Sequence, residues 1–242
     1  MRHVFCHGIP GSVKDAALFG AAHTAIDCDA LDLFDIGRDP SAHLRAMTFG
    51  EPVHLIGFSI GAMTALQLAA ECPDIVARGT LVSAGAPLSL GRFLPHMAGR
   101  PVFQMARFAP ILLRGLTWWQ GRMLGFAPDR IVGMLTATCG PDERALLTSG
   151  DGAPVLRAAL ETSFVDHPAD YIRLIRGYVT DWADVLPRIA CPVDLWHGTN
   201  DTWAPFTMAQ SLCEALGPRA TLHPIEGGEH YTTLTQVRLT SE

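Results

Sequence analysis

The sequence predicts an α/β protein whose mostly parallel sheet of about six strands carries helices on both faces, together with an all-helical insertion. Short apolar runs typical of buried strands alternate with helical patterns in the first third of the chain and again near its end. Between these parts, from about residue 89 to about 186, apolar residues recur only at helical spacing. The 242 residues are 48% hydrophobic and 17% charged, which is enough for one large domain with a substantial core.

The first third of the chain alternates strands and helices. Val4-Phe5-Cys6 is a short apolar run that leads into a loop rich in Gly and Pro. Residues 25–31 alternate apolar and charged side chains, which is typical of a strand at a sheet edge. The expected elements, in order, are a strand at 4–6, a helix at 13–23, a strand at 25–31, a helix at 40–48, a strand at 53–56, a helix from 62 to near Pro73 and a strand at 79–84.

The middle of the chain is punctuated by prolines at positions that suit helix starts and breaks. Helices are expected at 102–114, 116–125, 129–138, 142–148, 154–164, 168–178 and 181–188. We therefore expect an α/β core at residues 1–88 and 187–242, with residues 89–186 forming a helical cap or lid. An apolar stripe in this segment would normally be core, although part of it could roof a pocket; its members are Leu116, Trp118, Trp119, Met123, Leu124 and Phe126.

The alternation of strand and helix resumes towards the C-terminus. A strand is expected at 192–198, followed by a helix at 205–216 that Gly217 and Pro218 close. A last strand at 220–225 and a helix at 231–238 complete the expected elements.

The stretch with the clearest chemical meaning is Gly57-Phe58-Ser59-Ile60-Gly61, between the expected strand at 53–56 and the helix after it. A serine at the apex of such a strand–turn–helix holds its hydroxyl clear of the backbone, and flanking glycines remove Cβ atoms that would collide. The first amides of the following helix have no helical partner and carry the positive end of the helix dipole. We expect Ser59 to adopt a strained backbone conformation there.

A serine hydroxyl becomes a good nucleophile only when a base takes its proton, and the base needs a third group that fixes its tautomer. In a parallel sheet such groups lie in loops at the carboxyl ends of strands. Asp201 follows the expected strand at 192–198, and His230 follows the one at 220–225. The chain order is therefore Ser, Asp, His, the order recorded for α/β-hydrolases.

In four pieces that occur in this order the sequence resembles the α/β-hydrolase superfamily: residues 7–11, residues 57–61, Gly198-Thr199-Asn200-Asp201 with Pro205, and Gly227-Gly228-Glu229-His230. The resemblance implies that Ser59 is the nucleophile, His230 the general base and Asp201 the orienting carboxylate. It also implies that the backbone N–H groups of Ile60 and Ile9 hold the oxyanion. A loop with Gly8, Pro10 and Gly11 could bring the Ile9 amide close and hold it rigidly, as oxyanion stabilisation requires.

The sequence departs from the usual pattern of this superfamily in one respect. Members of this superfamily usually have two further strands before the one that ends in the His-Gly motif, but here that motif begins at residue 7. We therefore expect a core shortened at its N-terminus, with about six strands and the strand near 25–31 at an edge.

Other acids and histidines have structural interpretations. Asp194 lies within a strand and Asp184 at a helix end, so Asp201 is the preferred carboxylate. Among the histidines, His223 is expected to be structural, His197 to hydrogen-bond the backbone, and His7 to brace the oxyanion loop.

The bulk composition excludes some classes of function. The net charge of −6 does not favour binding to nucleic acid. Six scattered cysteines show no metal or redox spacing, so neither a metal nor a cofactor is expected. The N-terminus resembles no signal peptide, and no apolar run approaches the roughly 18 residues of a membrane span. These observations favour a cytoplasmic protein without a membrane segment.

Charge is unevenly distributed along the chain. Residues 89–180 contain ten arginines against seven acids, whereas the remainder contains eight basic residues against 17 acids. A solvated helical surface would explain this, and so would a cap that meets an anionic substrate or an acidic carrier protein through arginine.

The function expected from these features is hydrolysis of an ester, or of a thioester or lactone, with an apolar acyl part. C–C bond hydrolases and a lyase of the menaquinone pathway use the same three residues, and the opening from His7 to Ser12 is similar to theirs. A non-catalytic receptor of the same fold is the alternative from another class. A serine rather than an aspartate at position 59 argues against dehalogenases and epoxide hydrolases.

Overall fold

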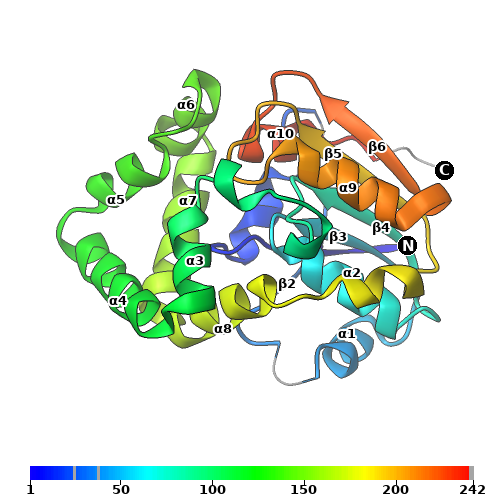
Figure 1. Ribbon diagram of the computed structural model, residues 1–242. Coiled ribbons are helices and arrows are strands. Elements are labelled where there is room, and N and C mark those ends of the chain that lie inside the picture. The colour runs from blue at the N-terminus through cyan, green and yellow to red at the C-terminus, as the bar shows by residue number, and fades with distance from the viewer. Residues whose placement is uncertain (24–25, 37–38, 240–242) are drawn as a thin grey trace.

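A computed structural model describes residues 1–23, 26–36 and 39–239. Its centre is a six-stranded, wholly parallel sheet with the strand order β2-β1-β3-β4-β5-β6 (Figure 1). The strands are β1 (Arg2–Cys6), β2 (Asp29–Leu31), β3 (Val53–Phe58), β4 (Val76–Val82), β5 (Val193–Gly198) and β6 (Ala220–Ile225). The predicted six-stranded α/β fold is confirmed, and β2 is an edge strand as expected.

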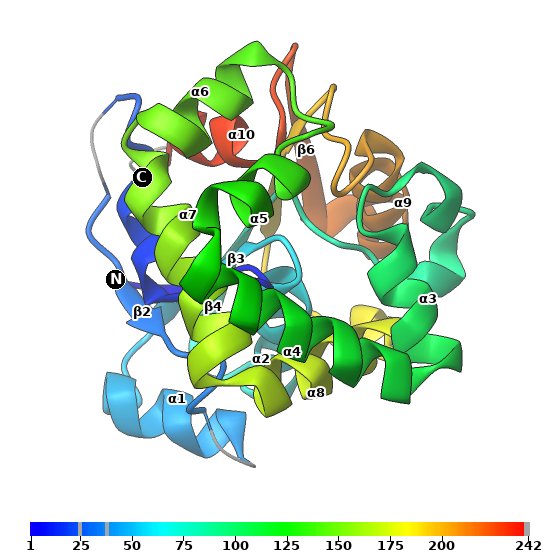
Figure 2. The same cartoon turned by 90° about the vertical axis from the view of Figure 1, so that its left-hand side faces the viewer.

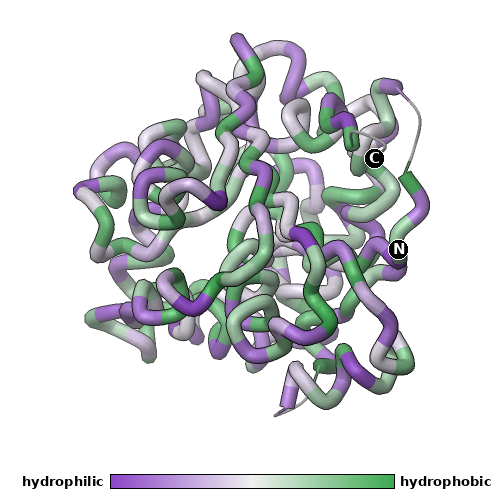
Figure 3. Tube along the Cα trace, turned by 90° about the vertical axis from the view of Figure 1, so that its right-hand side faces the viewer, coloured by the Kyte–Doolittle hydropathy of each residue, from purple (hydrophilic) through white to green (hydrophobic). Residues whose placement is uncertain are grey.

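The central strands are rich in apolar residues because both faces of the sheet are covered. All six residues of β3 are buried. One face packs against α2 (Gly61–Glu71) and α9 (Phe206–Leu216). Beside these helices lie α1 (Pro40–Thr48), which contacts α2, and the 3₁₀ helix η5 (Ala183–Arg188), which contacts both. The other face packs against the 3₁₀ helix η1 (Val13–Leu18) and α10 (His230–Gln236). Viewed from the side away from the insertion, the trace alternates between hydrophobic and hydrophilic residues, as expected for elements with one buried face (Figure 3).

The helical segment lies between β4 and β5 in the chain and stands to one side of the sheet (Figure 1). It contains η2 (Leu88–Leu90), η3 (Leu94–His96), α3 (Arg100–Phe108), α4 (Pro110–Phe126), α5 (Pro128–Leu135), α6 (Pro141–Ser149), α7 (Gly152–Glu161), the π-helical turn η4 (Thr162–Asp166) and α8 (Pro168–Val179). Helix α6 packs against α10, and α7 packs against η1. Helix α4 crosses the face of this segment that is turned away from the sheet (Figure 2).

Several element boundaries differ from those predicted. The break expected near residue 115 lies at Ala109 and Pro110, because proline starts α4 and cannot continue α3. The expected helix at 13–23 is only the short η1, and the strand expected at 25–31 contains three paired residues; residue 25 lies outside the described residues. Helix α10 begins at His230 itself, not after it. In the described ranges, no helix is long and apolar enough to cross a membrane.

The register of the sheet brings the candidate residues to one edge. Cys6 pairs with Gly57, so the loop after β1 lies beside the turn that contains Ser59. Phe58 pairs with Val82 at the end of β4, and Gly198 pairs with Ile225 at the ends of β5 and β6. Because all six strands are parallel, the loops after them meet at the same edge.

Candidate active site

The turn at Ser59 is strained, as predicted. Ser59 has φ 56°, in the left-handed region that non-glycine residues rarely adopt. A Cβ at position 61 would lie 2.3 Å from the carbonyl oxygens of both Cys6 and His7, and one at position 57 would lie 2.6 Å from the Ala62 Cα. The two glycines are therefore required by close backbone approach, since no side-chain movement could relieve these contacts.

The end of the neighbouring strand holds the strained turn in place. The Ser59 N–H donates to the Val82 carbonyl at 3.0 Å, and the Ser59 carbonyl accepts from the Gly85 N–H at 3.1 Å. Ser83, between these partners, also has a positive φ of 46° and is fully buried. Its hydroxyl donates to the carbonyl oxygen of His230 at 2.9 Å. The loop after β4 thus supports both the serine and the histidine.

Ser59, His230 and Asp201 form a continuous hydrogen-bonded series. The distance between Ser59 Oγ and His230 Nε2 is 2.9 Å, and that between His230 Nδ1 and Asp201 Oδ2 is 2.8 Å. The other oxygen, Asp201 Oδ1, accepts from the N–H groups of Trp203 and Ala204 at 2.8 and 2.9 Å. A carboxylate fixed in this way imposes the Nδ1–H tautomer, which leaves Nε2 free to accept the serine proton.

The electrostatics of the series favour a cationic imidazole next to an ionised carboxylate. Burial by itself would lower the pKa of His230, but the charges of Asp201, Glu143 and Asp15 together raise it above its ordinary value. Burial would likewise raise the pKa of Asp201, yet the neighbouring His230 and the amide of Ala204 lower it. The site can therefore stabilise the imidazolium that forms when Ser59 loses its proton.

The two amides expected to face an oxyanion are both available. Among the described residues, the N–H groups of Ile9 and Ile60 donate no hydrogen bond to the protein. Ile60 directly precedes α2, and Ile9 lies in the loop after β1. These are donors that a negatively charged oxygen could use.

The loop that contains Ile9 is held from several sides. The Gly8 N–H donates to the fully buried Asp15 carboxyl at 3.2 Å, and the Gly11 N–H donates to Ser163 Oγ of the helical segment, also at 3.2 Å. His7 accepts at Nε2 from the Leu33 N–H at 3.0 Å, so its Nδ1 carries the proton and donates to the Gly8 carbonyl at 2.8 Å. The prediction that His7 braces this loop is confirmed.

Of the remaining candidates, Asp194, His223 and Asp184 are not part of the series, whereas His197 Nε2 lies 3.6 Å from Asp201 Oδ2. His223 Nε2 and Asp194 Oδ1 are 2.9 Å apart, and Asp194 also accepts from Arg78 at 2.7 Å, so this acid belongs to a structural cluster. The Nε2 of His197 is 2.7 Å from the Ala204 carbonyl, which is the expected backbone hydrogen bond. Asp184 lies exposed on η5. The structural interpretations of His197 and His223 are confirmed.

Several residues near this series had no recognisable signal in the sequence. Asp15, Ser163 and Glu143 are all fully buried and come from η1, η4 and α6, far from the sequence pieces that suggested the site. Ser83 is different, because it lies near the end of the strand predicted at 79–84 and could have been found by its place at the sheet edge. The apolar stripe on α4 also differs from its expected place in the core: Leu124 is buried, but Trp118 and Phe126 are 68% and 75% exposed.

The described ranges contain no group of three or more His, Cys, Asp or Glu side chains placed to hold a metal ion. The six cysteines are free thiols.

Comparison with known proteins places this chain in a family. A family model described as "Alpha/beta hydrolase family" matches residues 4–239. Comparison with curated proteins found no sequence relative. Similar solved structures include a thermophilic esterase (17% identity, 96% of this chain and 83% of that chain, TM-score 0.60) and an enol-lactonase from Burkholderia xenovorans LB400 (14% identity, 95% and 84%, TM-score 0.61).

A third similar structure is described as an N-acyl homoserine lactone degrading enzyme (18% identity, 97% of this chain and 88% of that chain, TM-score 0.54). At these identities the structural likeness shows a shared fold. Because the family model covers nearly the whole chain, the protein belongs to the alpha/beta hydrolase family.

Proposed function

We propose that the protein hydrolyses carboxylic esters with an apolar acyl part, and related thioesters or lactones, through an acyl-enzyme on Ser59. The observation that supports this most directly is the series from Ser59 Oγ through His230 to Asp201, with its distances of 2.9 and 2.8 Å. The strained turn at Ser59, with the amide of Ile60 directly after it, gives further support.

In the first half of the reaction, Ser59 Oγ attacks the carbonyl carbon of the ester while its proton moves to His230 Nε2. The carbonyl oxygen becomes an oxyanion, which the N–H groups of Ile9 and Ile60 would stabilise. Collapse of the tetrahedral intermediate breaks the bond to the leaving alkoxide, and the imidazolium returns the proton to that oxygen. Asp201 stabilises the imidazolium throughout.

In the second half, His230 takes a proton from a water molecule that attacks the acyl-enzyme. The second tetrahedral intermediate uses the same two amides. Its collapse releases the carboxylic acid and returns the proton to Ser59 Oγ. The net reaction consumes one ester and one water molecule and forms one acid and one alcohol.

Residues 89–186 are proposed as the cap over this edge of the sheet. Ser163 contacts the loop that contains Ile9, and Glu143 contacts the helix that begins at His230, so the segment borders both halves of the site. Two similar structures carry names of lactone-cleaving enzymes. A lactone is a cyclic ester, and the same steps would open it.

The test is covalent labelling together with turnover. A fluorophosphonate probe should add its mass at Ser59, and p-nitrophenyl esters of increasing acyl length should be hydrolysed, with neither reaction in Ser59→Ala. Absence of labelling and of turnover in a folded protein would reject the proposal and favour a non-catalytic receptor. Turnover that survived in Ser59→Ala would indicate a mechanism without a serine nucleophile.

A further inference from the structure

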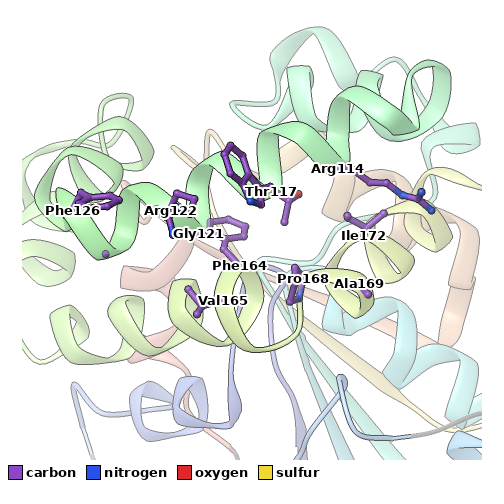
Figure 4. Close-up of a pocket in the computed structure, with 12 residues that line it drawn as sticks. Arg114, Thr117, Gly121, Arg122, Phe126, Phe164, Val165, Pro168, Ala169 and Ile172 are labelled. Carbon is purple, nitrogen blue, oxygen red and sulfur yellow. The ribbon is translucent and has the colours of Figure 1, made fainter.

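An open apolar groove of about 670 Å³ lies on the helical segment, between α4 and the chain from η4 into α8 (Figure 4). Its volume falls within the range of small-molecule sites. The part of its lining that matters here is Arg114, Trp118, Arg122 and Phe126 from α4, opposite Phe164 and Ile172. None of Ser59, Asp201 and His230 contributes to it, so the groove is separate from the candidate active site.

The two charged residues that line the groove, Arg114 and Arg122, are both arginines. Neither Arg114 nor Arg122 makes an ion pair with a described residue; the guanidinium of Arg122 lies 5.2 Å from the centre of the Phe126 ring. The sequence has no Asp or Glu between Asp74 and Asp129, so α4 brings no acid to the groove. Unpaired guanidinium groups beside apolar walls suit a ligand with an anionic head and an apolar tail.

We propose that this groove binds a single-chain anionic amphiphile, such as a long-chain carboxylate, with its tail between α4 and η4 and its head at Arg114 or Arg122. An occupant would touch Phe164 and Val165, which directly follow Ser163. Because Ser163 accepts the hydrogen bond of Gly11 at 3.2 Å, the groove is joined to the loop of Ile9 through one π-helical turn.

Two glycines on α4 provide a matched experiment. A Cβ at Gly125, which lines the groove, or at Gly115, which does not, would meet no heavy atom within 4 Å. Gly125→Leu should therefore fill the groove and Gly115→Leu should leave it open, while both variants gain helix propensity. Both are made in Ser59→Ala protein, so that turnover cannot contribute.

The readout is quenching of tryptophan fluorescence by 12-bromododecanoate, because Trp118 lines the groove. Saturable quenching is expected in the parent and in Gly115→Leu, and its loss in Gly125→Leu. Arg114→Gln and Arg122→Gln together, or replacement of the probe by 12-bromododecanol, should weaken binding about tenfold or more. Equal affinity in the two glycine variants would overturn the proposal. The proposal would also be overturned if both glycine variants sedimented equally with phosphatidylglycerol vesicles but did not bind the monomeric probe. That result would indicate a lipid surface as the partner.

A second inference comes from two carboxylates that connect the cap to the helix of His230. Glu143 of α6 is fully buried, and its two oxygens accept from the N–H groups of Tyr231 and Thr232, each at 2.7 Å. In return, both oxygens of Glu229 accept from the N–H of Gly140, the residue before α6, at 2.8 and 3.0 Å. Glu143, within α6, thus satisfies two of the first amides of α10. Glu229, directly before α10, satisfies the amide of the residue directly before α6.

On the basis of the function proposed above, we infer that Glu143 is a positioning residue that holds His230 in register with Ser59. His230 is the first residue of α10, so the two amides that Glu143 binds directly follow it. The charged or titratable groups that face His230 are Asp201 from the loop after β5, His197 from β5, Asp15 from η1 and Glu143 itself. Of the three acids, only Glu143 comes from the cap.

The variants that test this are Glu143→Gln, Glu229→Gln and the exposed control Glu161→Gln. Glu143→Gln should lower kcat about tenfold with little change in KM, and the His230 imidazole should titrate at lower pH by NMR. Glu229→Gln should weaken the same contact with a smaller effect on titration, and Glu161→Gln should change neither quantity. An unchanged His230 titration in folded Glu143→Gln would overturn the inference. NMR does not require turnover, so a failure of the proposed function would be seen separately as absent hydrolysis by the parent protein.

Discussion

The N–H of Gly8 donates a hydrogen bond to the carboxyl of Asp15, an acid with no exposed surface, at 3.2 Å. Asp15 Oδ1 has no partner among the described residues. Gly8 directly precedes Ile9, one of the two residues whose amides are proposed to hold the oxyanion. The buried acid therefore supports the loop at an electrostatic cost, because burial raises the pKa of Asp15 to about 7.

This relationship predicts a pH-dependent stability. Asp15 binds a proton more tightly in the folded protein, so its contribution to the free energy of unfolding is greatest below the unfolded pKa of 3.8 and is lost as pH rises to about 7. Asp15→Asn keeps an acceptor for Gly8 but cannot ionise. Its free energy of unfolding, measured by urea denaturation, should therefore fall less over this pH interval. Asp15→Ala should destabilise at every pH, by about 1–3 kcal/mol, because the Gly8 N–H loses its acceptor. Parallel pH curves for Asp15→Asn and the parent would contradict this account.

The pH dependence of catalysis should follow His230. The base must be neutral to accept the serine proton, and its pKa lies above the ordinary value of 6.5. We therefore expect kcat/KM for a p-nitrophenyl ester to rise with pH through an acid limb centred above 6.5. A limb centred below that value would show that the charges of the surrounding acids do not outweigh burial.

Two aspartates near the ends of the same strand allow the orienting acid to be identified. Asp201→Asn should lower kcat by about 10⁴-fold with the protein still folded, because the imidazole then loses its fixed tautomer. Asp194→Asn should leave kcat nearly unchanged and lower the free energy of unfolding by about 1–3 kcal/mol, since Asp194 bonds Arg78 and His223 instead. The reverse pattern in steady-state kinetics and urea denaturation would reassign the role to Asp194.

The approach of Gly61 to the β1 loop can be tested with a single methyl group. Gly61→Ala places a Cβ 2.3 Å from two carbonyl oxygens, so Ser59 should be displaced and fluorophosphonate labelling should slow by at least about a hundredfold. Gly79→Ala is the matched control, because its nearest neighbour would be a Val193 methyl at 3.5 Å, an ordinary contact. Circular dichroism distinguishes a misplaced serine from an unfolded chain. Equal labelling of the two variants would show that the turn tolerates the side chain.

Much of the core could be predicted because its signals are local. Neighbouring residues predicted a strand at 53–56 and a helix at 40–48, and the structure has the buried strand Val53–Phe58 and the helix Pro40–Thr48, with proline at its start. Of the boundaries that were wrong, the break at Pro110 has a local cause, whereas the short length of η1 goes with distant packing, since η1 contacts α7 and α10. Residues 13–23 have a helical pattern, but only Val13–Leu18 form a helix, which is a short 3₁₀ helix on one face of the sheet.

The sequence by itself determined the order of elements, the parallel sheet and the three residues of the hydrogen-bonded series, because strand periodicity and turn glycines are properties of short stretches. Only the tertiary structure decided which buried acids surround His230, that Glu143 and Glu229 each bond the start of the other's helix, and that Trp118 and Phe126 face outward beside a groove. Such relationships join residues that are far apart in the chain, such as Glu143 and Tyr231, which are 88 positions apart. They depend on how packed helices meet in space, and no short stretch of sequence encodes that.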